Sequence, residues 1–238
     1  MNRSITIARR ELASYFYSPI AYVAMTLFLL ATGALFWGDF QPGQPVGMRT
    51  IFDWMVWLLV FVIPVLSMGL LAQEWSTGTF ETLMTAPLTE TQVVVGKFLG
   101  SMLFFVLLMA PTLLYVVMLA LNGRPDLGPI FAGYLGILLV GGLFCAIGLF
   151  CSSLTRSQVV AAVASAAVLF VMTIVPWWAV TRPPLSGFWR RAADQGVFAR
   201  YADFSKGIID TANVAFFVAA TAVFLFLTVK VVESRRWK

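Results

Sequence analysis

Few residues in this chain have the side-chain chemistry for catalysis or metal binding. The sequence contains no histidine, which removes Ser-His and Cys-His nucleophilic catalysis and histidine metal sites. Its two cysteines, Cys145 and Cys151, would lie on different faces of one helix, because a spacing of six residues is not a whole number of turns. The lysines, at positions 97, 206, 230 and 238, fall at the ends of apolar runs or between them, where serine-lysine chemistry is poorly placed. We therefore predict no catalytic residue, metal site or cofactor on this chain.

The most specific polar segment, residues 73–88, separates two long apolar runs and reads Gln-Glu-Trp-Ser-Thr-Gly-Thr-Phe-Glu-Thr-Leu-Met-Thr-Ala-Pro-Leu. A short helix over residues 79–85 would carry Phe80, Leu83 and Met84 on one face. An apolar patch of this kind, rimmed by acidic residues, is typical of a docking surface for a soluble partner. The alternative is an amphipathic turn that rests on lipid headgroups.

Helix signals on both sides divide this region into helix, break, short helix, break and helix. The preceding apolar run should continue as helix until Gly78, a residue suited to ending it. Thr89 and Gln92 have capping-box spacing and would start the next long helix. Glu74 and Glu81, seven residues apart, would share a face if the helix were continuous.

By composition, these segments belong to a membrane protein. Over 238 residues the chain is 60% hydrophobic and 11% charged, with a mean hydropathy of +0.88, whereas charged residues make up roughly 25% of a soluble domain. A run of about 20 apolar residues crosses the hydrocarbon core as a helix. Six such runs lie at residues 19–37, 54–71, 98–121, 131–151, 159–180 and 214–232. We predict an all-α membrane protein with six transmembrane helices, forming a single domain over residues 1–238.

Basic residues set the expected orientation. If the amino terminus is cytoplasmic, an even number of spans returns the carboxyl terminus to the cytoplasm, and the span ends most closely flanked by Lys and Arg lie inside. The first apolar run exceeds the roughly 7–15 residues of a signal-peptide core, so we expect it to remain as a span. The net charge of +5 then reflects topology and anionic headgroups rather than a nucleic-acid partner. The expected location is the bacterial inner membrane, with both termini cytoplasmic.

An amphipathic segment precedes the first span. Within residues 1–18, helical spacing places Ile5, Ala8, Leu12 and Phe16 on one side. This pattern predicts a helix that lies in the cytoplasmic interface. The alternative is a plain start to the first span with a basic orientation signal.

A second amphipathic segment, residues 181–213, precedes the last span. Val197, Tyr201, Phe204 and Ile208 recur there at intervals of four, three and four residues. We expect an outer helix that lies at the membrane surface or folds back into it. The alternative is a helix that merely caps the bundle.

Three prolines, Pro64, Pro111 and Pro176, fall within the second, third and fifth predicted spans. Each removes a backbone hydrogen bond and allows a kink, so each is a candidate hinge. A static kink satisfied by a neighbouring helix is the alternative.

The polar segment and its flanks resemble the first cytoplasmic loop in the permease subunits of type-2 ABC exporters. The resemblance runs through Glu74-x-x-x-Gly78-Thr79-x-Glu81-x-Leu83-Met84-x-x-Pro87-Leu88 and the following Gly96-Lys97. Two further stretches resemble the gliding-motility-type permeases: residues 8–22, with Ala-Arg-Arg-Glu-Leu and Ser-Pro-Ile-Ala-Tyr, and residues 204–210, Phe-Ser-Lys-Gly-Ile-Ile-Asp. Together they cover essentially the whole chain.

The resemblance implies a division of labour between chains. In such transporters a separate ATPase subunit binds ATP and Mg²⁺, and this sequence indeed lacks the Gly-x-x-x-x-Gly-Lys-Ser/Thr phosphate loop. Two permease subunits, identical or homologous, assemble with two ATPase subunits, often with an auxiliary subunit that has a large outer domain. The cytoplasmic loop, residues 72–97, would receive the ATPase motion. Its coupling residues, from the motif and the predicted short helix, are Glu74, Gly78, Thr79, Phe80, Glu81, Leu83, Met84 and Pro87.

The function that follows is alternating access driven by ATP, either to export a substrate or to do mechanical work on an outer partner. The spans contain almost no charge, which disfavours a densely charged solute and leaves an amphiphile, a lipid-linked glycan or a polypeptide. The alternative function is an ion-coupled secondary transporter that acts without an ATPase. The same scarcity of charge disfavours it, because such carriers are expected to place ionisable residues at mid-membrane.

Overall fold

The computed structural model describes residues 3–39, 47–79, 89–123, 125–181 and 196–236, and within them every regular element is a helix. The elements are α1 (Arg3–Tyr17), α2 (Pro19–Asp39), α3 (Arg49–Ser67), α4 (Ala72–Thr77), α6 (Glu90–Met109), η1 (Ala110–Thr112), α7 (Leu113–Asn122), α8 (Leu127–Leu154), α9 (Gln158–Thr181), α11 (Val197–Ser205) and α12 (Thr211–Arg236). Six helical stretches are long and apolar enough to cross a membrane: α2, α3 with α4, α6 with α7, α8, α9 and α12. The predicted all-α membrane protein with six spans is confirmed.

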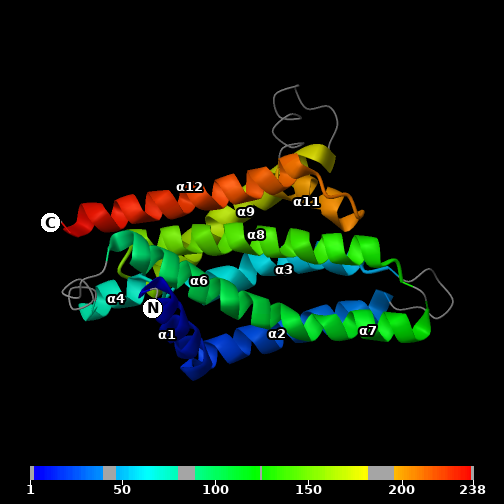
Figure 1. Ribbon diagram of the computed structural model, residues 1–238, viewed down its shortest axis with the longest axis horizontal. Coiled ribbons are helices and arrows are strands. Elements are labelled where there is room, and N and C mark those ends of the chain that lie inside the picture. Colours follow the sequence, from blue (N-terminus) through cyan, green and yellow to red (C-terminus); the bar gives the residue numbers. More distant parts are fainter. Residues whose placement is uncertain (1–2, 40–46, 80–88, 124, 182–195, 237–238) are drawn as a thin grey trace.

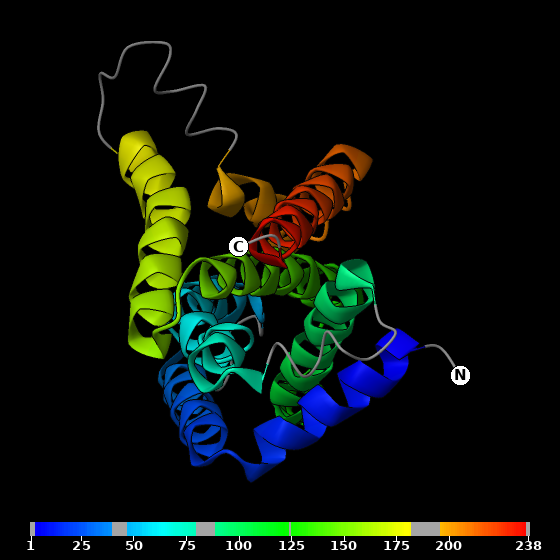
Figure 2. The same ribbon diagram turned by 90° about the vertical axis from the view of Figure 1, so that its left-hand side faces the viewer.

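The spans alternate in direction, so the start of α1, the short helix α4 and the end of α12 lie together at one end of the bundle (Figure 1). We call this the α4 end. The start of α8 and the helix α11 lie toward the other end, which we call the α11 end. Viewed along the bundle, α8 lies in the middle and α1 crosses beside α6 at the near end (Figure 2).

Helix α8 forms the core of the bundle. Its most apolar window is 78% buried, against 11% for α12, because α3, α6, α9, α11 and α12 all contact it. Glycines allow this close packing. A Cβ atom on Gly133 would lie 2.3 Å from the Phe52 ring, and one on Gly141 would lie 2.2 Å from the Phe105 ring. Small residues therefore bring α3 and α6 close to α8, as expected where helices pack within a bilayer.

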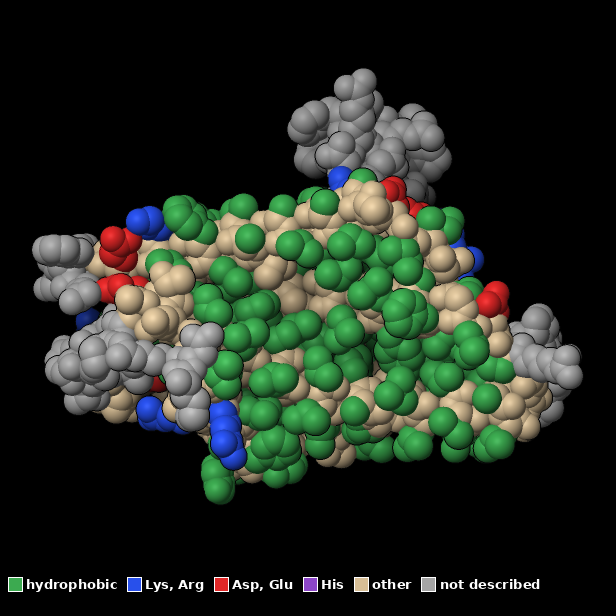
Figure 3. Space-filling model, viewed as in Figure 1, with side chains coloured by type: hydrophobic (Ala, Val, Ile, Leu, Met, Phe, Trp, Pro, Cys, Tyr) green, Lys and Arg blue, Asp and Glu red, His purple; other side chains and the backbone are tan. Residues whose placement is uncertain are grey.

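The outer surface of the bundle is apolar across its middle and charged toward its ends (Figure 3). Exposed apolar side chains on α9 include Val160, Val163 and Phe170, which are 55%, 64% and 44% exposed. A surface this apolar is unstable in water but matches the hydrocarbon of a bilayer. The six long helices are therefore placed to span a membrane.

The second span differs from the prediction in one respect. A continuous helix was expected until Gly78, but α3 ends at Ser67 and a turn over residues 68–71 separates it from α4. Gly78 does end α4, with φ of 70°, a left-handed conformation that glycine adopts without strain. The turn follows Pro64, whose carbonyl accepts from the Met68 amide, 3.0 Å away.

The third span is also divided. It runs as α6, a short 3₁₀ segment η1 that contains Pro111, and α7, whereas a single helix was predicted. Its start is as expected: Thr89 caps α6, and both hydrogen bonds of the capping box with Gln92 are present at 3.3 Å. Pro176 lies inside α9, as Pro64 lies inside α3. Whether any of the three prolines acts as a hinge stays a prediction.

Helix α1 forms where it was predicted, and only part of its predicted apolar side is buried against the bundle. Ala8 and Tyr15 are 3% and 8% exposed, whereas Ile5 and Phe16, assigned to the apolar side, are 58% and 45% exposed. The reason is tertiary: α1 packs along α6 through a stripe that includes small and polar residues. Ile5 and Phe16 are left as exposed apolar groups.

Helix α11 packs onto the bundle through the predicted face. Val197, Tyr201 and Phe204 are each at most 2% exposed, and a Cβ atom on Gly136 of α8 would lie 2.7 Å from Phe204. Ile208, the fourth member of the predicted face, is 55% exposed because α11 ends at Ser205. These contacts fit a helix that caps the bundle, and whether α11 also lies at the membrane surface or folds back into it stays a prediction.

Candidate functional site

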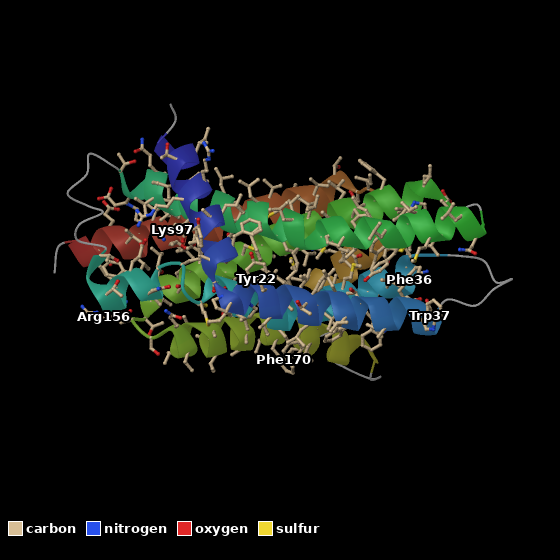
Figure 4. The ribbon with its side chains drawn as sticks, turned by 90° about the horizontal axis from the view of Figure 1, so that it is seen from below. Tyr22, Phe36, Trp37, Lys97, Arg156 and Phe170 are labelled. Carbon is tan, nitrogen blue, oxygen red and sulfur yellow. The ribbon has the colours of Figure 1, made fainter. Side chains whose placement is uncertain are left out.

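A buried ion cluster joins three helices at the α4 end. The Lys97 Nζ atom, on α6, lies 3.0 Å from Glu11 Oε1 on α1 and 2.9 Å from Glu74 Oε1 on α4. Lys97 is 1% exposed, and within the described residues it is the charged residue that is buried. The two carboxylate side chains are 16% and 19% exposed. Figure 4 shows Lys97 lying beside α1, at the same end as Arg156 and far from Phe36 and Trp37.

The charges of this cluster do not balance. Two carboxylates face one ammonium group, and Glu74 Oε2 is buried without a hydrogen-bond partner. Burying a charge costs free energy unless it is paired, so each member depends on the others. Removal of Lys97 would leave two carboxylates close together with no cation between them. Any displacement of α4 that moved Glu74 would therefore change the electrostatic balance at α1 and α6.

Two glycines bring α1 close enough to α6 for this ion pair to form. A Cβ atom on Gly96 would lie 2.7 Å from Ile7 Cβ, and one on Gly100 would lie 2.7 Å from Glu11 Cβ. The two glycines are one turn apart on α6, with Lys97 between them, so α1 rests in a shallow groove and Glu11 lies beside the lysine. The contact is both steric and electrostatic, which fixes the crossing of α1 over α6.

Ser152 of α8 holds the turn between α3 and α4. Its hydroxyl accepts hydrogen bonds from the Leu71 and Ala72 amides, each 3.0 Å away, and donates to the Met68 carbonyl, 2.9 Å away. These backbone groups lie at helix ends, where the helices offer them no partner. Ser152 is 0% exposed. One side chain of the core helix thus satisfies three backbone groups of the turn on which α4 is mounted.

The carboxyl-terminal helix reaches the same place. The Arg235 guanidinium, near the end of α12, lies 5.0 Å from the centre of the Trp75 ring on α4. Arg235 also donates to the Leu154 carbonyl at the end of α8. Helix α4 therefore touches α12 through Trp75, α6 through Glu74 and α8 through its first turn.

Tyr15 adds a link from α1 to α3. Its hydroxyl donates to the Leu66 carbonyl, 3.1 Å away, and its ring stacks on Phe104 of α6 with centroids 4.5 Å apart. Burial raises the pKa of the Tyr15 hydroxyl well above its usual value, so the group stays protonated and remains a donor. The far end of α1 is thereby fixed against the end of α3.

Three of the predicted coupling residues can be located. Glu74 lies in α4, Gly78 ends it, and the Thr79 hydroxyl lies 2.9 Å from that of Thr77. The others, Phe80, Glu81, Leu83, Met84 and Pro87, lie outside the described residues, so the predicted docking face stays a prediction. Glu74 was expected on the rim of an exposed patch. In the structure its carboxylate is paired with Lys97 of α6, 2.9 Å away.

Sequence reasoning missed the remaining parts of the site. Lys97 was placed at a span end and Glu11 was known only from a motif, and nothing in their spacing, 86 residues apart, indicated contact. For Ser152 and Arg235, the sequence offered no pattern that indicated a contact with α4 or its turn. A lysine one residue after a glycine, early in an apolar helix, is the clue that a search for close helix crossings would have used.

These observations define the class of protein. The chain is a multi-pass membrane protein in which a buried ion cluster joins three helices at the α4 end, and among the described residues no group of His, Cys, Asp and Glu is arranged to hold a metal ion. Its sequence matches the ABC-2 family transporter protein family over residues 20–235, and the chain belongs to that family. It is therefore an ABC transporter permease, a transmembrane and generally non-catalytic type of subunit that works with an ABC ATPase subunit. No curated protein matches the chain.

Proposed function

We propose that this chain couples ATP hydrolysis on a partner ATPase to movement of its own spans through α4 and the Glu11–Lys97–Glu74 cluster. The observation that carries the proposal is the position of Lys97. It is buried where α1, α4 and α6 meet, and it is paired with a residue of each neighbouring helix. A displacement of residues 72–97 would be transmitted to α1 and α6 through the Lys97 side chain.

The contacts around α4 suggest how the motion spreads. Helix α4 is short and mounted on a turn, so it can shift with less disturbance than a full span. Its hydrogen bonds to Ser152 provide a pivot on the core helix α8, while Glu74 and Trp75 pull on Lys97 and Arg235. The spans would then rearrange between inward-open and outward-open states, which is alternating access.

Several parts of the proposal rest on family resemblance. The complex would contain two ATPase subunits, which bind ATP and Mg²⁺, and a second permease that is identical or homologous. The gliding-motility-type motifs favour an auxiliary subunit with an outer domain, which would allow mechanical work on that partner in place of export. The membrane would be the bacterial inner membrane, with the α4 end in the cytoplasm. An exported substrate would be an amphiphile, a lipid-linked glycan or a polypeptide, since the spans contain almost no charge.

The test is to purify the chain with its ATPase and compare the wild type with Glu74→Gln. We expect the ATPase to co-purify with both, and ATP to change hydrogen–deuterium exchange in α1 and α4 of the wild type. Glu74→Gln should hydrolyse ATP while the change in α1 is lost, because the neutral amide no longer holds Lys97 electrostatically. The matched control is Glu233→Gln, which removes an exposed carboxylate paired with Lys230 on α12 and should retain the coupled change.

Two results would contradict the proposal. Transport by this chain with no ATPase present would favour an ion-coupled secondary carrier. An ATP-dependent change in α1 that survives Glu74→Gln at full size would show that the signal takes another route.

A further inference from the structure

A cavity lined by described residues lies at the α4 end, beside the ion cluster. Its volume is about 500 Å³, and its walls come from α1, the start of α2, the end of α3, α4 and the start of α9. It is thus formed by segments far apart in the sequence. The cavity is large enough for a lipid headgroup with the first part of its acyl chains.

The lining of the cavity contains two chemically different sets of side chains. The polar set, called here the polar wall, includes Glu11, Ser14, Gln73 and Gln158. The apolar set, called the apolar wall, includes Ile20, Val65 and Leu66. A ligand that satisfies both walls must have a polar head and an apolar body, because a fully polar ligand would leave the apolar wall against water.

The charge of the polar wall is negative. Glu11 is the charged side chain among the described residues that line the cavity. Its Oε1 atom is paired with Lys97, and that lysine also pairs with Glu74, so two carboxyl groups share one ammonium group. The remaining polar groups are two amides and several hydroxyls, which accept hydrogen bonds as readily as they donate them. A cationic head that donates hydrogen bonds fits this wall better than an anionic one.

We propose that this cavity binds an amphiphile with a primary ammonium headgroup, the chemistry of phosphatidylethanolamine. The ammonium would lie against Glu11, Gln73 and Gln158, and the first part of the acyl chains would lie against Val65 and Leu66. Glu11 belongs to both the cavity and the ion cluster, so occupancy changes the environment of Lys97. This proposal deepens the proposed function by naming the ligand class at the coupling end, but ligand binding itself does not require the ATPase.

The binding test uses the purified full chain, without ATPase, and acyl-labelled phosphatidylethanolamine as the probe. Unlabelled phosphatidylethanolamine should compete best, phosphatidylcholine less well and phosphatidylglycerol least. Phosphatidylcholine keeps the positive charge but cannot donate hydrogen bonds, so its rank separates charge from hydrogen bonding. Glu11→Gln should weaken binding about tenfold, the effect of losing a hydrogen bond to a charged group.

A second pair of variants keeps the test valid if Glu11→Gln disturbs folding. Gln158 lines the cavity but has no contact with Lys97 in the ion cluster. Gln158→Glu should strengthen binding of phosphatidylethanolamine, and Gln158→Lys should weaken it by a similar factor. Glu233→Gln, an equal change of charge on exposed α12, should leave binding unchanged.

Equal competition by the three lipids, or identical affinities for Gln158→Glu and Gln158→Lys, would overturn the proposal. A final arm separates a resident lipid from cargo. In vesicles that contain the chain with its ATPase, ATP-dependent movement of the labelled lipid across the bilayer identifies cargo, and saturable binding without movement identifies a resident lipid. Both results support the site. Binding that follows the expected order in a chain that recruits no ATPase would sustain this inference while overturning the proposed function.

Discussion

The two ends of the bundle are held together in different ways. At the α4 end, polar contacts join residues that are 86, 81 and 51 positions apart, as in Lys97–Glu11, Leu71–Ser152 and Tyr15–Leu66. Toward the α11 end, polar contacts also join distant helices, as between the Thr32 and Tyr115 hydroxyls, which are 83 positions apart in sequence and 3.1 Å apart in space. The ion pair at that end, Lys206–Asp203, is exposed, whereas Lys97 is buried. Arg200 donates to Asn213, 13 positions on, and Asn213 donates to Asp203, 10 positions back.

Helix α11 itself is held to the core mainly by apolar packing. Tyr201 and Phe204 lie over Gly136 with no room for a side chain between them. Apolar packing is stiff and non-directional, whereas a buried ion cluster has few stable arrangements and responds to a change in any member. The difference is that displacement of one helix at the α4 end would disturb a buried charge, whereas at the α11 end it would disturb an exposed ion pair and apolar contacts.

The largest expected effect comes from breaking the ion cluster with Lys97→Met. Two partly buried carboxylates would be left without a cation, which should destabilise the fold by about 3 kcal/mol, the low end for a buried pair. Unfolding of the purified chain in detergent, followed by circular dichroism against temperature or denaturant, measures the loss. Lys230→Met, which breaks the exposed pair with Glu233, is the control and should cost about 0–1 kcal/mol. Similar losses in the two variants would show that the ion cluster contributes no more stability than an exposed ion pair.

The second effect concerns the pivot. Ser152→Ala leaves two amides and one carbonyl of the α3–α4 turn without their partner, and we expect a loss of about 2–3 kcal/mol. Hydrogen–deuterium exchange should rise most at Leu71 and Ala72, whose amides lose their acceptor. Ser234→Ala removes an exposed hydroxyl that bonds only within its own helix and should change stability by less than about 0.5 kcal/mol. An unchanged exchange rate at the turn would rule out the pivot.

The third test concerns the apolar α11 end. Gly136→Ala places a methyl group 2.7 Å from Phe204, and overpacking less the gain in helix propensity should cost about 1–2 kcal/mol. Gly142→Ala, on the same helix, meets nothing closer than 3.8 Å and should be neutral or slightly stabilising. If the comparison of the two ends is right, Gly136→Ala lowers stability while ATP-dependent exchange in α1 persists. Loss of that exchange would mean that both ends belong to one coupled unit.

The smallest effect is expected at an exposed pair near α11. Lys206 Nζ lies 3.7 Å from Asp203 Oδ1, and both side chains are at least 40% exposed. Lys206→Met and Asp203→Asn should therefore each change the free energy of unfolding by about 0–1 kcal/mol. A loss near that of Lys97→Met would contradict the assignment of charge-based stability to the α4 end.

Composition and periodicity predicted the six spans, the caps at Thr89 and Gly78, and the buried face of α11. These features depend on the residues within each segment, so one sequence suffices to find them. The broken second and third spans were not predicted. Hydropathy averages over a run and does not detect a turn such as residues 68–71, whose backbone groups are satisfied by a serine about 80 residues away.

The face of α1 and the ion cluster were beyond reach for a similar reason. Periodicity placed Ile5, Ala8, Leu12 and Phe16 on one side of α1. It could not show where α1 packs on another helix, because Gly96 and Gly100 of α6 decide that. Lys97 is close to a span end, where a lysine ordinarily reaches water. Its burial is possible because Glu11 and Glu74, on two other helices, pair with it.

The two cysteines, which offered no disulfide or metal site, have a practical value. Cys145 and Cys151 are 4% and 3% exposed, so the native thiols are inaccessible to a reagent in water. They need not be removed before a new cysteine is introduced. A water-soluble maleimide should therefore leave the native chain unlabelled, and a single introduced cysteine would carry the whole fluorescence or spin-label signal. Tyr17 and Trp37, 88% and 77% exposed near the two ends of α2, are suitable positions. A label at each would report separately on the α4 end and the α11 end.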